Sequence, residues 1–264
     1  MYIKMSNLLN ISPVDGRYRE LCEAFAEYFS EYGFMKYRLL IELKYFIELI
    51  NTFPELGNIN TNKNRENILN IFNNFNLKEA LLVKNIDKIV NHDVKSIEYY
   101  IKDKLLNIGL SPYYEYIHIG LTSQDINNTF LPLVIKESLY NQIIPIYNDI
   151  LNRLKTLGKK WINIPMLCRT HGQPASPSFL GKEILVFYER IQIQVDNLKT
   201  SKFYGKFGGA VGNFNSLYLT FPDIDWLKFG DDFLNKLGLN RSQFTKQIDH
   251  YDSLCNIFNI IRTN

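Results

Sequence analysis

Two long segments with apolar residues at every third or fourth position constrain the fold of this chain most strongly. The first, residues 131–157, carries Leu131, Val134, Ile135, Leu139, Ile143, Ile146, Ile150 and Leu154. The second, residues 179–199, carries Leu180, Ile184, Phe187, Tyr188, Ile191, Val195 and Leu198. This spacing gathers apolar side chains on one face of a helix. We therefore expect two long helices joined by a polar loop, with a bend where Pro145 removes a backbone hydrogen bond.

Shorter helical patterns flank this pair. Residues 22–50 read as an amphipathic helix broken near Gly33. Val94, Ile97, Ile101 and Leu105 form one stripe of another helix, for which we expect Asn91 or Asp93 as N-cap and Gly109 as stop. Helical character resumes near Asp231 and near Tyr251. The Asn-rich residues 58–76 are expected to form a surface excursion, because asparagine is a poor helix former.

The sequence has few strand signals, with neither sustained alternation nor an Asn-Gly or Asp-Gly turn between apolar runs. We expect a mostly α protein: an N-terminal helical domain over residues 1–111, followed over residues 112–264 by the start of a long-helix bundle. The final apolar pattern, "SLCNIFNIIRTN", stops without a C-cap glycine or a proline. We therefore expect the bundle to be incomplete at this point.

Composition narrows the function classes. The 264 residues are 46% hydrophobic, which is ample for a core, and 30 basic residues nearly balance 27 acidic ones. Without a basic run, neither nucleic acid nor an anionic membrane is an expected partner. Cys22, Cys168 and Cys255 lack zinc-site spacing, so we expect reduced thiols and no metal. The N-terminus has no apolar core of leader length, and we expect a cytoplasmic protein without membrane spans.

His171 is the strongest single candidate for chemistry. It lies in "RTHGQP", where Gly172 and Pro174 exclude a regular helix, so we expect a loop whose donors and acceptors are free to face a ligand. A histidine titrates near neutrality and can give a proton to a leaving group. The alternative is a loop histidine bonded to backbone.

Other short polar segments carry weaker signals. His92 lies in "NHD" at an expected helix start, where the Asp93 carboxylate could orient its ring. The spacing of Thr122 and Asp125 in "LTSQD" fits a capping box, and the same turn could bind a carboxylate through its hydroxyls and free N–H groups. Arg17 follows a rigid turn and suits a phosphate or carboxylate.

The remaining glycines and histidines favour structural roles. Gly205, Gly208, Gly209 and Gly212 match no nucleotide-binding motif, and close helix–turn packing is the preferred interpretation. His118 and His250 form no metal-ligand pair, and we interpret both as structural.

Several motifs in order resemble the adenylosuccinate lyase family of the aspartase/fumarase superfamily. They are "SPVDGRY", "NHDVKSIEYY", "HIGLTSQDINN", "RTHGQPASPSFLGKE", "GAVGNFN" and "QID". The resemblance implies a β-elimination that releases fumarate from adenylosuccinate to give AMP, and from the succinyl-carboxamide ribotide of purine synthesis. It implies no cofactor, a nucleotide substrate, and a homotetramer whose active sites are shared between subunits.

The resemblance also implies residue roles. His171 would be the general acid that protonates the leaving nitrogen. Asn91, His92 and Asp93 would contact and orient the substrate, and Arg17 with Tyr18 would anchor its phosphate. Thr122 and Ser123 would hold the succinyl carboxylates, with Thr170 supporting the same region and Gln247 as a further contact.

Two departures from the family pattern matter. The family's base is a serine in a loop reading roughly Ser-Ser-x-Met-Pro-x-Lys-x-Asn, and no such run occurs among the 264 residues. We therefore expect the chain alone to be inactive. "QIDHYDS" replaces an expected Glu-Pro-His-Asp-like run, which leaves Asp249, His250 and Asp252 without an assigned role.

Two other functions stay open at this point. A sister enzyme acting on argininosuccinate would need no phosphate anchor, and "SPVDGRY" argues against it. A non-catalytic helical oligomerisation module would expose apolar faces but would need neither His171 nor His92.

Overall fold

The computed structural model describes residues 11–264, which form two compact units. Residues 1–10 lie outside the described residues. The expectation that the N-terminus holds no leader falls mostly on these residues. Of the described residues, the first unit comprises residues 11–135 together with Phe203–His250, and the second comprises Lys136–Lys202 and Tyr251–Asn264. The domain boundary near residue 111 stays a prediction.

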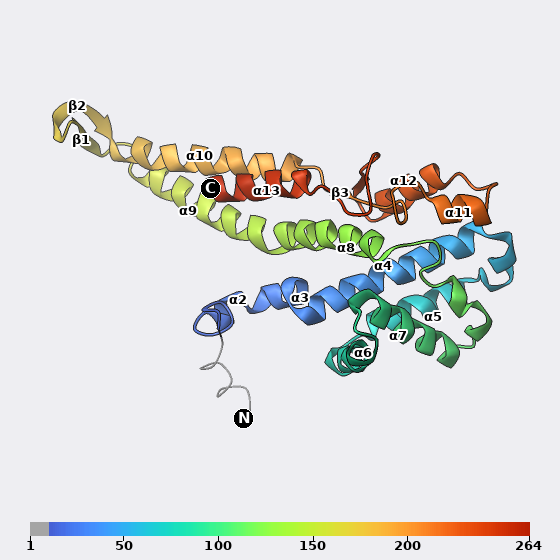
Figure 1. Cartoon of the computed structure of the whole chain (residues 1–264). Coiled ribbons are helices and arrows are strands. Elements are labelled where there is room, and N and C mark those ends of the chain that lie inside the picture. The colour runs from blue at the N-terminus through green and yellow to red at the C-terminus, as the bar shows by residue number, and fades with distance from the viewer. Residues whose placement is uncertain (1–10) are drawn as a thin grey trace. The chain divides into compact units, whose positions relative to one another are not determined.

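Helices dominate both units, as the periodicity predicts (Figure 1). The α-helices are α2 (Arg19–Cys22), α3 (Ala26–Phe29), α4 (Glu31–Thr52), α5 (Asn62–Asn73), α6 (Leu77–Val90), α7 (Asp93–Asn107), α8 (Ser123–Ser138), α9 (Ile144–Lys160), α10 (Leu180–Thr200), α11 (Asn215–Thr220), α12 (Trp226–Lys236) and α13 (Asp252–Thr263). Short 3-10 turns are η2 (Glu23–Phe25), η3 (Pro54–Ile59) and η4 (Ser111–Tyr116), and η5 (Leu139–Ile143) is a π-helix. The strands are β1 (Pro165–Thr170), β2 (Gln173–Phe179), β3 (Tyr204–Gly205) and β4 (Asn240–Arg241).

Helix α4 forms the centre of the first unit. Its buried face includes Leu39, Leu43, Phe46 and Leu49. The break expected at Gly33 falls three residues earlier, because the Ser30 hydroxyl caps α4 by accepting the N–H of Gly33 at 3.0 Å. Gly33 instead permits close packing, since an added Cβ would lie 2.7 Å from the carbonyl oxygen of Glu27.

The Asn-rich segment is more regular than its composition predicts. Helix α5 covers most of it, so the low helical content expected from asparagine is wrong, whereas most of its residues are at least partly exposed, as expected of a surface excursion. The Thr61 hydroxyl accepts the N–H of Asn64 at 3.2 Å, and Ile68 and Ile71 are buried. Burial of one apolar face and a good N-cap outweigh the low helix propensity of asparagine.

The second unit contains the expected long helices. α9 and α10 lie side by side, and α13 packs on α10 (Figure 1). The polypeptide remains helical from α8 into α9. The π-helical turn η5 directly precedes α9, whose second residue is Pro145. The helix is therefore irregular in η5, just before the bend that the sequence predicts at Pro145. Among residues 11–264, none of the helices combines the length and apolar character needed to cross a bilayer.

The connection between α9 and α10 differs from the loop that the sequence predicts. Strands β1 and β2 pair antiparallel, with Thr170 opposite Gln173 and an irregularity between Leu167 and Arg169. His171 and Gly172 form the two-residue turn, with φ values of 52° and 73°. Left-handed angles at both positions define the type I′ turn, whose twist suits a hairpin. The segment's backbone groups are thus largely used by the hairpin and are not free.

Candidate functional site

His92 lies at the junction of two helices. Asn91 ends α6 in the left-handed conformation, and His92 is the N-cap of α7, where we expected Asn91 or Asp93. The Nδ1 atom of His92 accepts the N–H of Lys95 at 3.1 Å, whereas the nearest Asp93 carboxylate oxygen lies 3.7 Å away. The cap, and not the carboxylate, orients the ring. Because Nδ1 accepts, Nε2 is the ring nitrogen left for a hydrogen bond to another group. Gly109, with φ 76°, follows the end of α7 as predicted.

Thr122 lies just before α8 and Ser123 is the first residue of that helix; both residues of this Thr122–Ser123 turn are partly exposed. Asp125 lies in the first turn of that helix, and its Oδ2 accepts the N–H of Thr122 at 2.9 Å. This is the acidic half of the capping box that the sequence predicts. Ser123 begins the helix, where N–H groups and the helix dipole favour an anion.

A polar stripe on α4 ties these two segments to one helix. Arg38 Nη2 lies 2.6 Å from Asp93 Oδ2, and Arg38 Nε donates to Asn127 Oδ1 of α8 at 2.9 Å. One and two turns further along, Glu42 contacts His118 and the Tyr45 hydroxyl donates to the Ile119 carbonyl at 2.8 Å. None of these α4 residues is among the site candidates that the sequence predicts. Arg38, Glu42 and Tyr45 are separated by four and three residues, which in the sequence indicates one face of a helix but does not identify the partners of these side chains.

His118 forms a partly buried ion pair. Its Nδ1 lies 2.6 Å from Glu42 Oε1, and Glu42 is fully buried. Burial alone would lower the pKa of His118, but the charge of Glu42 and the hydrogen bond outweigh it, so the pKa is raised. The structure agrees with a structural role for His118 in holding the segment before Thr122, and its backbone is left-handed at φ 62°.

The glycine-rich segment after β3 packs against the start of α8. An added Cβ at Gly205 would lie 3.3 Å from the Asn128 carbonyl oxygen, and one at Gly209 would lie 3.4 Å from that of Gly120. Gly208 accepts the N–H of Phe214 through its carbonyl at 2.7 Å, which closes the loop. The helix–turn packing expected for these glycines is confirmed.

Gln247 lies on an exposed loop beside this segment. A hollow of about 610 Å³ is lined by Gly212, Asn213, Gln243, Phe244, Thr245, Lys246, Ile248, Asp249 and His250. The buried Ser242 and Asp249 close the base of the loop through a side-chain hydrogen bond of 3.4 Å. Gln247 is therefore presented next to the glycine-rich segment, while Asp249 has a structural contact.

The phosphate-anchor candidates occupy a turn of their own in the first unit. The N–H of Gly16 donates to the Ser12 carbonyl at 3.0 Å, and that of Tyr18 donates to the Pro13 carbonyl at 2.9 Å. The turn is thus formed as predicted. Arg17 and Tyr18 are exposed, and the guanidinium of Arg17 lies over the Tyr18 ring at 5.6 Å.

Thr170 and His171 belong to the second unit, at the tip of the β1–β2 hairpin. Both are exposed, and His171 occupies the first turn position. His171 thus carries an exposed imidazole at a left-handed turn position, a conformation that is uncommon for a residue with a side chain. Within the described residues, no group of three His, Cys, Asp or Glu side chains could hold a metal ion.

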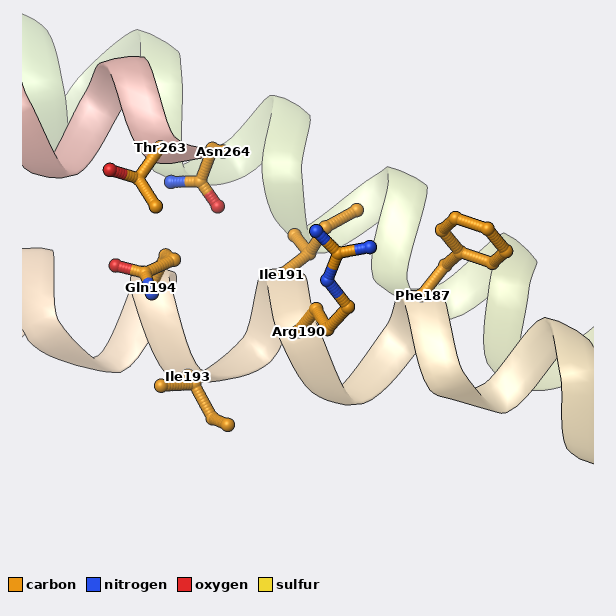
Figure 2. A pocket seen from close by; sticks show the side chains of 7 residues that line it. All are labelled: Phe187, Arg190, Ile191, Ile193, Gln194, Thr263 and Asn264. Atoms are coloured by element: carbon orange, nitrogen blue, oxygen red, sulfur yellow. The ribbon is translucent and has the colours of Figure 1, made fainter.

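A separate hollow in the second unit contains none of the predicted site residues. It measures about 350 Å³ and is lined by Phe187, Arg190, Ile191, Ile193, Gln194, Thr263 and Asn264 (Figure 2). Arg190 is the only charged side chain of the seven. The seven lining residues pair no acid with a base, so the candidate residues of each unit remain those on the loops of that unit described above.

Comparison with known proteins defines the class. Residues 16–263 match the family model described as Lyase, and the chain therefore belongs to this lyase family. Its curated relatives include adenylosuccinate lyases from Dictyostelium discoideum, 42% identical over 98% of this chain and 58% of the relative, and from Buchnera aphidicola subsp. Acyrthosiphon pisum, 39% identical over 97% and 57%. The chain thus spans less than two thirds of the length of these relatives.

Solved structures confirm the fold class. A fumarate lyase from Mesorhizobium sp. BNC1 superposes with a TM-score of 0.74 over 91% of this chain and 53% of its own, at 19% identity. A 3-carboxy-cis,cis-muconate lactonizing enzyme from Pseudomonas putida gives 0.68 over 91% and 52%, also at 19% identity. At such identity the likeness concerns the fold alone.

Proposed function

We propose that the protein carrying this chain is a carbon–nitrogen lyase of the adenylosuccinate type. It would release fumarate from adenylosuccinate to give AMP, and from the succinyl-aminoimidazole carboxamide ribotide of purine synthesis. The observation that carries the proposal is the 42% identity over 98% of this chain to a relative named adenylosuccinate lyase. No cofactor enters the proposed reaction.

In this proposal, His171 is the general acid. The elimination removes a proton next to a carboxylate and breaks the bond between carbon and the purine nitrogen, which must receive a proton as it departs. An exposed imidazole at the tip of a hairpin can approach that nitrogen. His92 is a second catalytic candidate, because the cap holds Nδ1 and leaves Nε2 for a hydrogen bond to another group.

Each of the remaining candidates is proposed to contact a different group of the substrate. Arg17 and Tyr18 would anchor the phosphate, with the planar guanidinium suited to two phosphate oxygens. Thr122 and Ser123 at the start of α8 would hold the succinyl carboxylates, supported by Thr170. Asn91, Asp93 and Gln247 would orient the nucleotide, and the ion pair between Asp93 and Arg38 would fix the Asn91–Asp93 segment.

The general base and the assembly complete the proposal. No counterpart of the family's serine loop occurs in the 264 residues, so we expect the chain alone to be inactive. We propose a homotetramer with shared sites, supported by exposed apolar side chains on α9 and α10, among them Ile146, Ile150 and Ile193. The three free cysteines suit the reducing cytoplasm, which is the proposed location.

An assay for fumarate release tests the function. The full-length protein is expected to convert adenylosuccinate and to bind a phosphate-free analogue far more weakly, because the analogue lacks the group that Arg17 would hold. Equal use of argininosuccinate, or no fumarate release from the nucleotide, would overturn the proposal.

A further inference from the structure

Asp125 and Lys206 form an ion pair that is completely buried in the first unit. The Lys206 Nζ lies 2.7 Å from Asp125 Oδ1, and both side chains have no exposed surface. Burying two charges costs free energy, and replacement of such a pair by neutral groups is often tolerated. The burial of this ion pair therefore does not by itself show that the pair stabilises the fold. Its role has to be inferred from the groups that the two side chains contact.

The Asp125 carboxylate joins two loops. Its Oδ2 accepts the N–H of Thr122 at 2.9 Å, on the turn proposed to hold the substrate carboxylates. Its Oδ1 accepts the N–H groups of Gly208 at 2.8 Å and Gly209 at 3.1 Å, 83 and 84 residues further along the chain. One carboxylate thus sets the separation of the Thr122–Ser123 turn and the glycine-rich loop.

Lys206 also links the glycine-rich loop to α8. Its Nζ donates to the Gly209 carbonyl at 2.5 Å, and its backbone N–H donates to the Asn128 carbonyl of α8 at 3.3 Å. The ammonium also neutralises Asp125, so that no net negative charge lies behind a turn that is to receive an anion.

The tip of the glycine-rich loop is exposed although its base is buried. Ala210 and Val211 face solvent, whereas Gly208 and Gly209 are buried. Gly209 adopts φ 78°, which a residue with a side chain rarely does. The loop is therefore a fixed surface beside the Thr122–Ser123 turn.

We propose that Asp125 and Lys206 are positioning residues that hold the Thr122–Ser123 turn and the Gly208–Gly212 loop as two walls of one dicarboxylate site. The inference rests on the proposed function, since it assigns this site to the succinyl half of the substrate. The pair acts on substrate only through the two loops.

The test uses a neutral pair that removes the link without leaving a buried charge. In Asp125→Asn with Lys206→Met, the single amide oxygen can accept from the turn or from the glycine loop but cannot replace both carboxylate oxygens. Lys104→Met serves as the control, because it breaks the Lys104–Glu79 pair of 2.6 Å, which involves no candidate site residue. Fumarate and AMP binding are measured separately by calorimetry in the full-length protein.

We expect the folded double variant to bind fumarate at least about tenfold more weakly, because small displacements of positioning groups are costly. AMP binding should change by less than about threefold, and the control should leave both affinities unchanged. Wild-type fumarate affinity in the folded double variant would overturn the inference while leaving the proposed function intact. If the wild-type protein binds neither ligand, the proposed function fails and the inference fails with it.

Hydrogen exchange on the wild-type protein gives a second test that needs no variant. Added fumarate should slow exchange in peptides covering both residues 119–126 and residues 207–214. Slowing in the first peptide alone would show that the glycine loop is not a wall of the site, which would overturn the inference even if the double variant does not fold.

Discussion

At the scale of single residues, the pair between His118 and Glu42 couples stability to pH. Because the folded-state pKa of His118 is raised, the pair's contribution is fully present below the unfolded pKa of about 6.5 and is lost as pH rises through the folded pKa. Glu42→Gln should therefore lower the free energy of unfolding most below about pH 6.5, and by progressively less above it.

Urea unfolding between acidic and alkaline pH measures this difference. Glu48→Gln on the same helix is the control, because its partner Lys236, at 2.6 Å, does not titrate in that range. A Glu42→Gln difference that stays constant with pH would contradict the account of His118.

Gly212 tests how tightly the glycine-rich loop and the Gln247 loop are packed. It adopts φ 85°, and an added Cβ would lie 2.2 Å from the carbonyl oxygen of Thr245. Gly212→Ala should lower the free energy of unfolding by about 2 kcal/mol or more. Gly57→Ala, where an added Cβ meets no atom within 4 Å, should change it by less than about 1 kcal/mol. Thermal unfolding of both variants measures this difference. Equal losses of stability in the two variants would contradict the close packing of Gly212 against Thr245.

At the scale of elements, α4 organises the candidate site through Arg38. Arg38→Met removes the contacts to Asp93 and Asn127 and should lower the free energy of unfolding by about 1–3 kcal/mol. It should also raise the KM for substrate, because the His92 segment loses its link to α8. Lys36→Met breaks an exposed pair with Glu27 and should cost only about 0–1 kcal/mol with no change in KM. Indistinguishable KM values for the two variants would contradict the role of Arg38.

The same elements show what could be predicted from the sequence. Helices α8 to α10 follow from apolar periodicity, and the helix ends near His92, Thr122 and Gly109 follow from helix-end chemistry. The N-cap of α7 is nevertheless His92 itself, and not Asn91 or Asp93. The β1–β2 hairpin was missed because His171, and not Asn or Asp, occupies the left-handed turn position.

Contacts between residues far apart in the sequence could not be predicted either. Arg38 and Asn127 are 89 residues apart, and Asp125 and Lys206 are 81 apart. Periodicity shows which side of a helix is buried, but it does not specify which distant segment a polar side chain on that helix will meet.

At the scale of the whole molecule, the exposed apolar side chains of α9 and α10 predict assembly. Light scattering of the full-length protein should give four copies, and Ile193→Glu, which adds a charge to α10, should produce smaller species. Leu219→Glu on α11 is an exposed control outside these helices and should leave the assembly unchanged. A monomeric wild-type protein at micromolar concentration would contradict the proposed tetramer.

The most direct test of the central claim is fumarate release from adenylosuccinate by the full-length protein and its His171→Asn variant. Asparagine suits the left-handed turn and should keep the hairpin, but it cannot supply a proton. We predict that kcat falls by about 10²–10⁴-fold, with unchanged circular dichroism and assembly. Near-wild-type turnover by the folded variant would contradict the assignment of His171 as the general acid.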